Sequence, residues 1–347
     1  MRGSPQRILL IKLRAIGDVV LATPALTAAR RAFPEARIDF LTEPPSRQVL
    51  EGNSDVDEVL LHDRRAPLAA RVRFLRRLRA KGYDLVIDLF GNPRSALFTL
   101  LTGAPTRVGF NFRVRQAAYN VRVPARGHLV HEVEFNLDAL RAIGVQVGVP
   151  RLQFPVPEAA RHFAQEFVAK NGLSDKLLIG LNNSGGWPAK RWLPERAARL
   201  AQLLAERHGT RVVLLWGPGE RDQAEQIAAA AGGDVLLAPP TDLHQLAALL
   251  ARLRLLVTTD SAPMHIAAAV GTPVVALFGP TNPLLQGPFG PGHIVVRNES
   301  LSCLGCNRTT CEDGACMREL AAETVYAACA EALSSSRPGQ EGRSHAQ

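Results

Sequence analysis

Short apolar runs alternate along the chain with longer stretches in which apolar residues recur every three or four positions. The first run is Ile8-Leu9-Leu10-Ile11, which is typical of a strand buried on both faces of a parallel sheet. Strands that alternate with amphipathic helices predict a doubly wound α/β domain. In the first half, the predicted strands are residues 7–12, 38–41, 56–61 and 84–88, and the predicted helices are residues 25–33, 68–81 and 133–143.

A proline-rich stretch, Pro150–Pro157, interrupts this alternation, and a second β–α series follows it. We therefore expect two Rossmann-like domains, residues 1–157 and 158–333, with a disordered polar tail at 334–347. In the second series the predicted strands are residues 177–181, 211–216, 253–258 and 273–278, and the predicted helices are residues 194–208, 220–231, 242–252, 262–270 and 324–333.

Composition supports a folded α/β protein and excludes several other classes. The chain has 347 residues, of which 46% are hydrophobic and 21% charged, so it is not a disordered protein. Its apolar runs all fall short of the roughly 18 residues of a membrane span. The polar segment Met1–Pro5 leads directly into the first strand and does not resemble a signal peptide. With only five cysteines, we expect a cytoplasmic protein.

The positive charge is confined to the first domain. The chain has 41 basic and 32 acidic residues, a net charge of +9. Residues 1–150 contain 23 basic and 14 acidic residues, whereas residues 151–347 contain 18 of each. Residues 64–79 hold seven arginines and no acid, and no acid lies between Asp88 and Glu132. A solvated surface is the default interpretation of such arginines, but two acid-free basic stretches in one domain favour an anionic ligand or surface. No nucleic-acid-binding motif accompanies them.

One candidate site follows the first strand, in the segment Lys12-Leu-Arg-Ala-Ile-Gly-Asp18. Ligands of open α/β sheets bind at the carboxyl ends of the strands, so Asp18 is placed where a general base could act. The alternative is that Asp18 caps the helix that follows.

A second candidate site follows the strand at 177–181, in the loop Asn182–Trp192. The backbone N–H groups of such a loop can bind phosphate, and Lys190 adds a positive charge. The alternative is a solvated glycine-rich loop. Farther along, the turn Trp216–Glu220 places Glu220 where it could bind a ribose, or where it simply favours a helix start.

The segment Thr258–Thr281 holds the strongest candidate site. Asp260 and Ser261 end a predicted strand, and Pro263 begins a helix whose amino end points to the carboxyl edge of the sheet, which suits a diphosphate. Asp260 could cap this helix or bind a sugar hydroxyl. His265 lies on the first helical turn, where it could line the site or be a hydrogen-bonded core residue.

Four cysteines lie within 14 residues, at Cys303, Cys306, Cys311 and Cys316. Their spacing is compatible with a structural zinc site, with disulfides or with reduced thiols in a loop. Zinc is the metal that this pattern suggests, and it would be structural.

The motifs described above, taken together and in this order, resemble those of glycosyltransferase family 9, the ADP-heptose:lipopolysaccharide heptosyltransferases and their relatives. The resemblance covers about residues 7–333 and rests on the segments Lys12–Pro24, Lys190–Trp192, Gly217–Glu220, Asp260–His265 and Gly279–Thr281. It implies a GT-B fold, in which two Rossmann-like domains face each other across a cleft, the first binding the acceptor and the second the donor. It also implies a final helix that crosses back onto the first domain.

The resemblance further implies a role for individual residues. Asp18 matches the catalytic base, and Lys12, with a looser match at Arg64 and Arg65, matches acceptor-binding residues. The residues that match donor contacts are Ser184, Lys190, Glu220, Asp260, Ser261, Met264 and His265.

The function that follows from this resemblance is an inverting, metal-independent transfer of heptose, or a related sugar, from ADP-heptose to the lipopolysaccharide inner core. No cofactor would be required for catalysis. The acceptor would be of the lipid A–Kdo type, at the anionic inner face of the inner membrane, with the enzyme peripheral to it. Alternatives are a GT-B enzyme for another nucleotide sugar, such as an epimerase or a non-heptose transferase, and a catalytically inactive nucleotide-sugar-binding protein.

Overall fold

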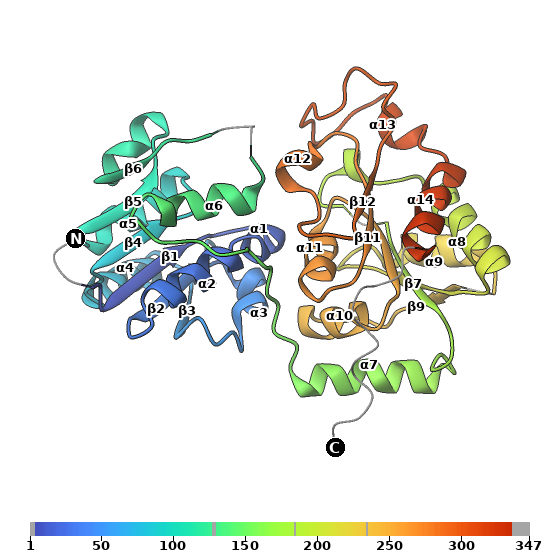
Figure 1. Ribbon diagram of the computed structural model, residues 1–347, viewed down its shortest axis with the longest axis horizontal. Helices are drawn as coiled ribbons and strands as arrows, with labels where there is room; N and C mark the ends of the chain where they lie inside the picture. Colours follow the sequence, from blue (N-terminus) through green and yellow to red (C-terminus); the bar gives the residue numbers. More distant parts are fainter. Residues whose placement is uncertain (1–3, 127–129, 184, 234, 335–347) are drawn as a thin grey trace.

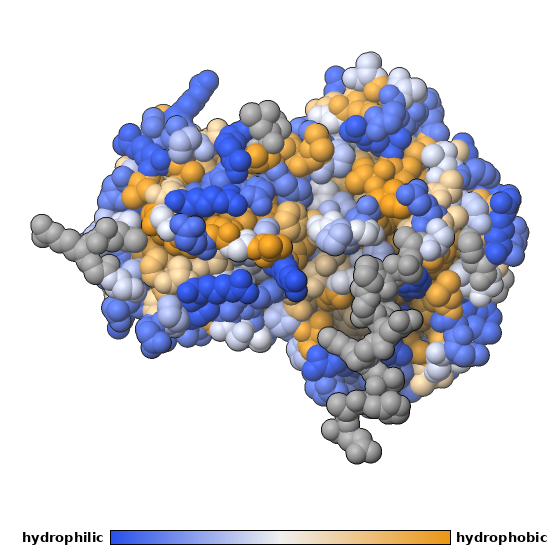
Figure 2. All heavy atoms as spheres, viewed as in Figure 1, coloured by the Kyte–Doolittle hydropathy of each residue, from blue (hydrophilic) through white to orange (hydrophobic). Residues whose placement is uncertain are grey.

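The computed structural model describes residues 4–126, 130–183, 185–233 and 235–334. The chain folds into two α/β domains, the first on the left of Figure 1 and the second on the right. Each domain contains a parallel sheet of six strands, as the alternating pattern predicted. In the space-filling view the domains form two lobes joined side by side (Figure 2).

The first sheet has the strand order β3-β2-β1-β4-β5-β6. Its strands are β1 (Arg7–Ile11), β2 (Arg37–Thr42), β3 (Glu58–Leu61), β4 (Leu85–Asp88), β5 (Thr106–Phe110) and β6 (Val121–Val123). Its helices are α1 (Ile16–Val20), α2 (Thr23–Ala32), α3 (Arg47–Leu50), α4 (Leu68–Ala80), α5 (Pro93–Thr102) and α6 (Glu132–Arg141), with short 3₁₀ turns at Pro44–Ser46 and Arg113–Ala118.

Strand β1 is the centre of this sheet. Its residues Ile8–Ile11 are fully buried because β1 pairs in parallel with both β2 and β4 and is covered on both faces. One face packs in a core shared with α2 and α6, and the other packs in a core shared with α4 and α5. This two-sided burial explains the continuous apolar run in the sequence.

The second sheet repeats this arrangement, with the order β12-β11-β10-β7-β8-β9. Its strands are β7 (Leu178–Asn182), β8 (Arg211–Leu215), β9 (Val235–Leu237), β10 (Leu255–Thr259), β11 (Val274–Leu277) and β12 (Ile294–Val296). Its helices are α7 (Glu158–Lys170), α8 (Pro194–His208), α9 (Arg221–Ala231), α10 (Leu243–Leu250), α11 (Ala262–Ala269), α12 (Pro283–Gln286), α13 (Ala315–Arg318) and α14 (Ala322–Ser334), with a 3₁₀ turn at Pro188–Lys190.

Both sheets have a topological switch point, where the strand order reverses direction. The switch lies between β1 and β4 in the first sheet and between β7 and β10 in the second. Open α/β sheets bind ligands outside the carboxyl ends of the strands at such points. The segments that follow β1, β7 and β10 contain the candidate residues Asp18, Lys190 and Asp260, so the topology supports their selection.

Two close contacts join the domains near these switch points. Helix α1 approaches α11 so closely that a β-carbon on Gly17 would lie 2.5 Å from Cδ2 of His265. At the start of α6, Nε2 of His131 lies 3.0 Å from the carbonyl oxygen of Gly287.

A third contact joins α3 to α10. The backbone N–H of Leu243 donates to the side-chain oxygen of Gln48 at 3.0 Å, and Nε2 of His244 lies 2.8 Å from the carbonyl oxygen of Gln48. The chain itself crosses between the domains from the end of α6 to α7, which runs beneath the second domain in Figure 1.

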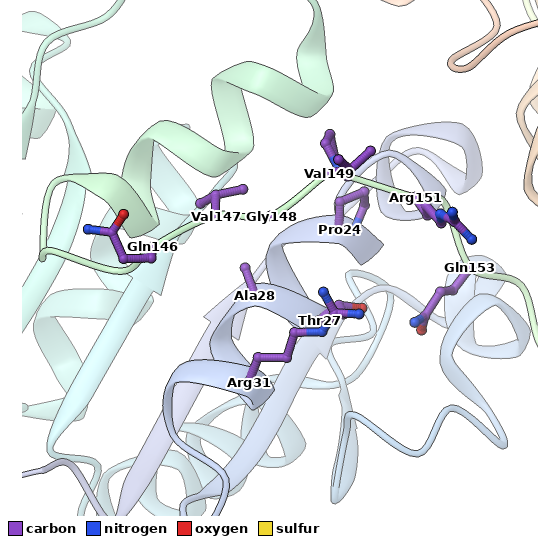
Figure 3. A pocket seen from close by; sticks show the side chains of 11 residues that line it. Pro24, Thr27, Ala28, Arg31, Gln146, Val147, Gly148, Val149, Arg151 and Gln153 are labelled. Carbon is purple, nitrogen blue, oxygen red and sulfur yellow. The ribbon is translucent and has the colours of Figure 1, made fainter.

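Where this crossing segment passes over α2, it leaves a cavity of about 320 Å³ (Figure 3). Side chains of α2, such as Ala28 and Arg31, line it opposite Val147 and Val149. It contains none of the predicted site residues and lies where the linker and helix pack imperfectly, so we assign it no catalytic role.

The last helix differs from the expectation. Helix α14 packs against α8 and against strands β10, β11 and β12 of its own domain. The crossing back onto the first domain that the resemblance implied is not seen for α14 within the described residues. Its buried face, which includes Val325 and Cys329, is instead part of the core of the second domain. Of the predicted tail, only Ser334 lies within the described residues.

No helix in the described parts of the chain is long and apolar enough to cross a membrane.

Candidate active site between the two domains

Asp18 lies in α1, the first helix after β1, and its side chain is half-buried. One carboxylate oxygen accepts a hydrogen bond from the backbone N–H of Ala15 at 2.8 Å, so the residue does contribute to capping. Burial raises the pKa of Asp18; the positive charge of Lys12 opposes that rise, and the negative charges of Glu132 and Asp260 add to it. Asp18 is therefore a carboxylate with increased basicity that faces charged groups of both domains.

Lys12 is buried, with 2% of its surface exposed. Its Nζ donates to the carbonyl oxygen of Leu89 at 3.0 Å, to the side chain of Asn136 at 3.2 Å and, in a short ion pair, to Glu132. Lys12 thus ties the ends of β1 and β4 to α6. The acceptor contact expected for Lys12 would have to compete with these three partners.

Asp260 follows β10 in the second domain and is 6% exposed. Its Oδ2 accepts a hydrogen bond from Thr281 Oγ1 at 2.7 Å and lies 2.7 Å from Nζ of Lys190, whose side chain is also mostly buried. The Lys190 ammonium lies 4.2 Å from the centre of the Trp187 ring. The predicted residues Lys190 and Asp260 are therefore in direct contact, although 70 positions separate them.

The amino end of α11 lies beside this pair. Ser261 precedes the helix, and its Oγ accepts a hydrogen bond from the Asn182 side chain at 3.1 Å. Met264 is fully buried in the core, and its backbone N–H already donates to the carbonyl oxygen of Ser261. Ser261 is therefore at the site edge, whereas a donor contact by the Met264 side chain would require it to leave the core.

His265 joins this site to the first domain. It is 5% exposed and lies against Gly17, one residue before Asp18. Burial lowers the pKa of His265 to about 4, so the ring is neutral at physiological pH. Its Nδ1 is buried and makes no hydrogen bond with the described residues, which leaves a polar atom for a ligand between the domains.

Glu220 lies at the start of α9, where its carboxylate accepts a hydrogen bond from the backbone N–H of Gly217 at 2.8 Å. The neighbouring Asn183 donates to the carbonyl oxygen of Trp192, but its own buried Oδ1 has no partner among the described residues. Glu220 and Asn183 line one small hollow at the carboxyl end of β8. Ser184, the other predicted donor residue of this region, lies outside the described residues.

Arg64 and Arg65 are exposed and line a hollow of about 720 Å³ beyond the carboxyl ends of β2 and β3. Glu43, which pairs with Arg94 at 2.6 Å, and His62 line the same hollow. The hollow lies at the carboxyl edge of the first sheet, as Asp18 does, and the resemblance implies acceptor binding by this domain.

The four cysteines do not form a metal site in this structure. Cys303, Cys306 and Cys311 are exposed and Cys316 is buried. Among the described residues, no group of three or more Cys, His, Asp or Glu side chains is arranged to hold a metal ion. The observed arrangement therefore does not fit the zinc site that the spacing suggested.

Two residues of the site were not predicted from the sequence: Glu132 and Asn136, which hold Lys12. Thr281, which donates to Asp260, was included in the predicted segment Thr258–Thr281 without a role of its own. Glu132 is the first acid after the acid-free stretch that begins beyond Asp88, which is the one sequence signal that could have drawn attention to it. Nothing in the local pattern pairs Glu132 with a lysine 120 positions away.

Two Rossmann-like domains that meet near their switch points, with a half-buried carboxylate in one and a Lys–Asp pair in the other, have the architecture of the GT-B class. The sequence identifies the family within that class: residues 71–316 match glycosyltransferase family 9 (heptosyltransferase). The chain belongs to this family and is a glycosyltransferase, as the motifs predicted.

Curated relatives and solved structures agree with this assignment. Lipopolysaccharide heptosyltransferase 1 of Pseudomonas aeruginosa is 29% identical over 88% of this chain and 87% of its own length. A family 9 glycosyltransferase structure from Veillonella parvula is 29% identical, with a TM-score of 0.84 over 94% of this chain and 97% of its own. Escherichia coli heptosyltransferase WaaC, solved with ADP-2-deoxy-2-fluoro heptose, is 26% identical, with a TM-score of 0.73 over 94% of this chain and 99% of its own.

Proposed function

We propose that this protein transfers heptose from ADP-heptose to the inner core of lipopolysaccharide, with inversion at the anomeric carbon. The observation that carries the proposal is the contact of α1 with α11, in which Gly17, the neighbour of Asp18, lies against His265, on the helix that follows Asp260 and its partner Lys190. The names of the similar heptosyltransferases, and the ADP-heptose analogue bound to one of them, support this choice of substrates.

In this mechanism Asp18 is the general base. It removes the proton from an acceptor hydroxyl while that oxygen attacks the anomeric carbon, on the face opposite the nucleotide. Because burial raises its pKa, Asp18 accepts the proton more readily than an exposed aspartate would. General-base catalysis of this kind contributes roughly 10²–10⁴-fold to the rate.

Lys190 assists the departure of ADP. As the glycosidic oxygen leaves, negative charge develops on the diphosphate, and the ammonium of Lys190 stabilises it in a site with little water. A bound diphosphate would draw Lys190 away from Asp260 and release Asp260 to accept a hydrogen bond from a sugar hydroxyl. Ser184, Glu220, Ser261 and His265 would complete the donor site around the ribose, the phosphates and the sugar.

The transfer is proposed to need no metal ion and no other cofactor, since Lys190 supplies the positive charge at the diphosphate. Enzyme treated with a chelating agent and then freed of it should keep its full rate. A rate that falls and returns with added Mg²⁺ or Mn²⁺ would contradict metal independence.

The acceptor is proposed to be of the lipid A–Kdo type, bound along the first domain by Arg64 and Arg65. Such an acceptor carries phosphates and carboxylates, and it lies in an anionic membrane. We therefore place the protein in the cytoplasm, at the inner face of the inner membrane, with the arginine-rich first domain toward the lipid.

The decisive experiment measures ADP release from ADP-heptose in the presence of deacylated lipid A–Kdo acceptor, with product mass as a second readout. A mass increase of one heptose per acceptor is expected, and UDP- and GDP-sugars should be poor donors. Folded enzyme that binds ADP but transfers no heptose, or that prefers another nucleotide sugar, would refute the proposed donor.

A further inference from the structure

The segment with the four cysteines, residues 303–316, lies directly on the candidate donor site. We call it the cysteine segment. Its backbone N–H groups at Gly305 and Asn307 donate to the carbonyl oxygens of Gly279 and Pro280, at 3.0 and 2.7 Å. These two acceptors belong to the turn that ends with Thr281. The cysteine segment therefore holds the turn that carries Thr281, one of the two residues whose side chains contact Asp260.

The same segment also holds the loop that carries Lys190, the other residue in contact with Asp260. The backbone N–H of Ala189, next to Lys190, donates to the carbonyl oxygen of Thr309 at 3.2 Å. Just beyond the segment, the carbonyl oxygen of Leu320 accepts from the Trp192 indole at 2.9 Å. Lys190 is thus fixed on both sides by residues 309–320.

The side chains of the two residues held in this way contact the same atom of Asp260. Lys190 Nζ and Thr281 Oγ1 both lie 2.7 Å from Oδ2 of Asp260. Packing tightens this arrangement, since a β-carbon on Gly279 would lie 2.6 Å from Sγ of Cys316. Any shift of the cysteine segment therefore moves the Lys190 loop or the Thr281 turn relative to Asp260.

We propose that the cysteine segment is a positioning element for the donor site, which sets the place of Lys190 and Thr281 on Asp260 and so the affinity for the nucleoside diphosphate. This inference rests on the proposed function, because it takes Lys190 as a contact of the diphosphate. It assigns to residues 303–316 a role in binding, although their own side chains do not enter the reaction.

Asn307 allows a test that acts through the backbone alone. Its φ is +57°, which a β-branched residue strongly disfavours and glycine adopts freely, and its side chain is exposed. Asn307→Val should displace the N–H that donates to Pro280, whereas Asn307→Gly should keep it. The two variants form a matched pair.

Calorimetric titration with ADP and steady-state kinetics then measure the effect. Asn307→Val is expected to weaken ADP binding and raise KM for the donor about tenfold, the effect of losing about 1.4 kcal/mol. KM for the acceptor should stay unchanged, Asn307→Val should still unfold in one cooperative transition at a somewhat lower temperature because of its backbone strain, and Asn307→Gly should bind ADP within about twofold of the parent protein. An equal loss in both variants, or none in Asn307→Val, would overturn the proposal.

The cysteines offer an independent measurement. Alkylation of the exposed Cys303, Cys306 and Cys311 with N-ethylmaleimide should weaken ADP binding in the parent protein. A variant with serine at these three positions should bind ADP and resist the reagent. Equal ADP affinity before and after alkylation would contradict the positioning role of the cysteine segment but not the proposed function. A parent protein that binds no ADP would contradict both.

Discussion

Replacing Asp18, the proposed base, should separate catalysis from binding. Asp18→Asn keeps an oxygen that can accept the hydrogen bond from Ala15 but removes the proposed base, so we expect kcat to fall by about 10²-fold or more. Calorimetry should give an ADP affinity close to that of the parent protein. Transfer at the parent rate would exclude Asp18 as the base.

The same variant should be more stable than the parent at neutral pH. Because burial raises the pKa of Asp18 in the folded protein, the folded state holds this proton more tightly than the unfolded chain does. Stability therefore falls as pH rises from the ordinary pKa of an aspartate through the raised one, and Asn removes this loss. Denaturant unfolding at acidic and neutral pH should show the stabilisation of Asp18→Asn at neutral pH only.

Lys12 and Glu132 should shift the activity profile in opposite directions. Lys12 lowers the pKa of Asp18 and Glu132 raises it, so the acidic limb of kcat/KM should move to higher pH in Lys12→Met and to lower pH in Glu132→Gln. Lys12→Met should also lose about 3 kcal/mol of stability, because Glu132 is left without its partner. The double variant Lys12→Met/Glu132→Gln should recover part of that stability. If the acidic limb of kcat/KM stays at the same pH in both single variants, Lys12 and Glu132 do not set the pKa of Asp18.

At the scale of single elements, the close contact between α1 and α11 requires a residue without a side chain at Gly17. Gly17→Ala would place a β-carbon 2.5 Å from a ring carbon of His265, which is buried and cannot easily move away. The helices must then separate, which takes Asp18 away from Asp260. We expect kcat/KM to fall at least about tenfold, since small displacements of reacting groups are costly.

Gly233→Ala is the matched control, because a β-carbon there would meet no atom within 4 Å. Adding His265→Ala to Gly17→Ala relieves the clash, and X-ray scattering of both variants should report the domain separation. If Gly17→Ala is as active as Gly233→Ala, the contact does not control the approach of the two domains.

Helices and strands were predicted correctly where their burial produces a clear hydrophobic pattern in the sequence. Strand β1, buried on both faces, and helix α8, with its amphipathic spacing, agree with the expected ranges. Helix α5 was missed although Asn92 caps it and Gly103 ends it with φ of +71°, because its apolar residues lack a clear 3.6-residue period. Strands β6, β9 and β12 have three residues each, too few for any periodic signal.

The candidate site was predictable to the same extent. The strand ends that carry Asp18 and Asp260 could be located because the strands before them are continuous apolar runs. The contact of Lys190 with Asp260 was not predicted, although both residues were assigned to the donor site, because it depends on how the loop after β7 packs beside the end of β10. The Lys12–Glu132 pair could not be predicted, since it depends on how α6 packs across the ends of β1 and β4.

For the whole molecule, the arginine excess predicts a membrane-facing side. On α4, Arg71, Arg73 and Arg76 are exposed and make no ion pair with the acids that the structure describes. Exposed Leu68 and Val72 lie on the same helix, and exposed Leu97 and Leu100 lie on the neighbouring α5. In contrast, Arg107 and Arg126, which lie in the acid-free stretch between Asp88 and Glu132, are bound within the domain. Arg107 donates to the carbonyl oxygen of Ala118, and Arg126 donates to Asp138.

Reversing the three α4 charges to glutamate should therefore weaken co-sedimentation with phosphatidylglycerol vesicles. The loss should be greatest at low salt, because exposed charges are screened over about 8–10 Å at physiological ionic strength. The same reversal at Arg199, Arg221 and Arg252 of the second domain is the control and should have little effect. Binding that is equal in the two triple variants would argue that α4 does not face the lipid.

The contacts between the domains share a chemical form that bears on how such enzymes diversify. In each of the three, a histidine of one domain meets the other domain at its backbone: His131 at Gly287, His244 at Gln48 and His265 at Gly17. A contact made to main chain survives most substitutions of the residue contacted. The two domains can therefore change much of their sequence independently, and exchanging one domain between related enzymes should be tolerated wherever the three histidines, Gly17 and Gln48, whose side chain accepts from Leu243, are kept.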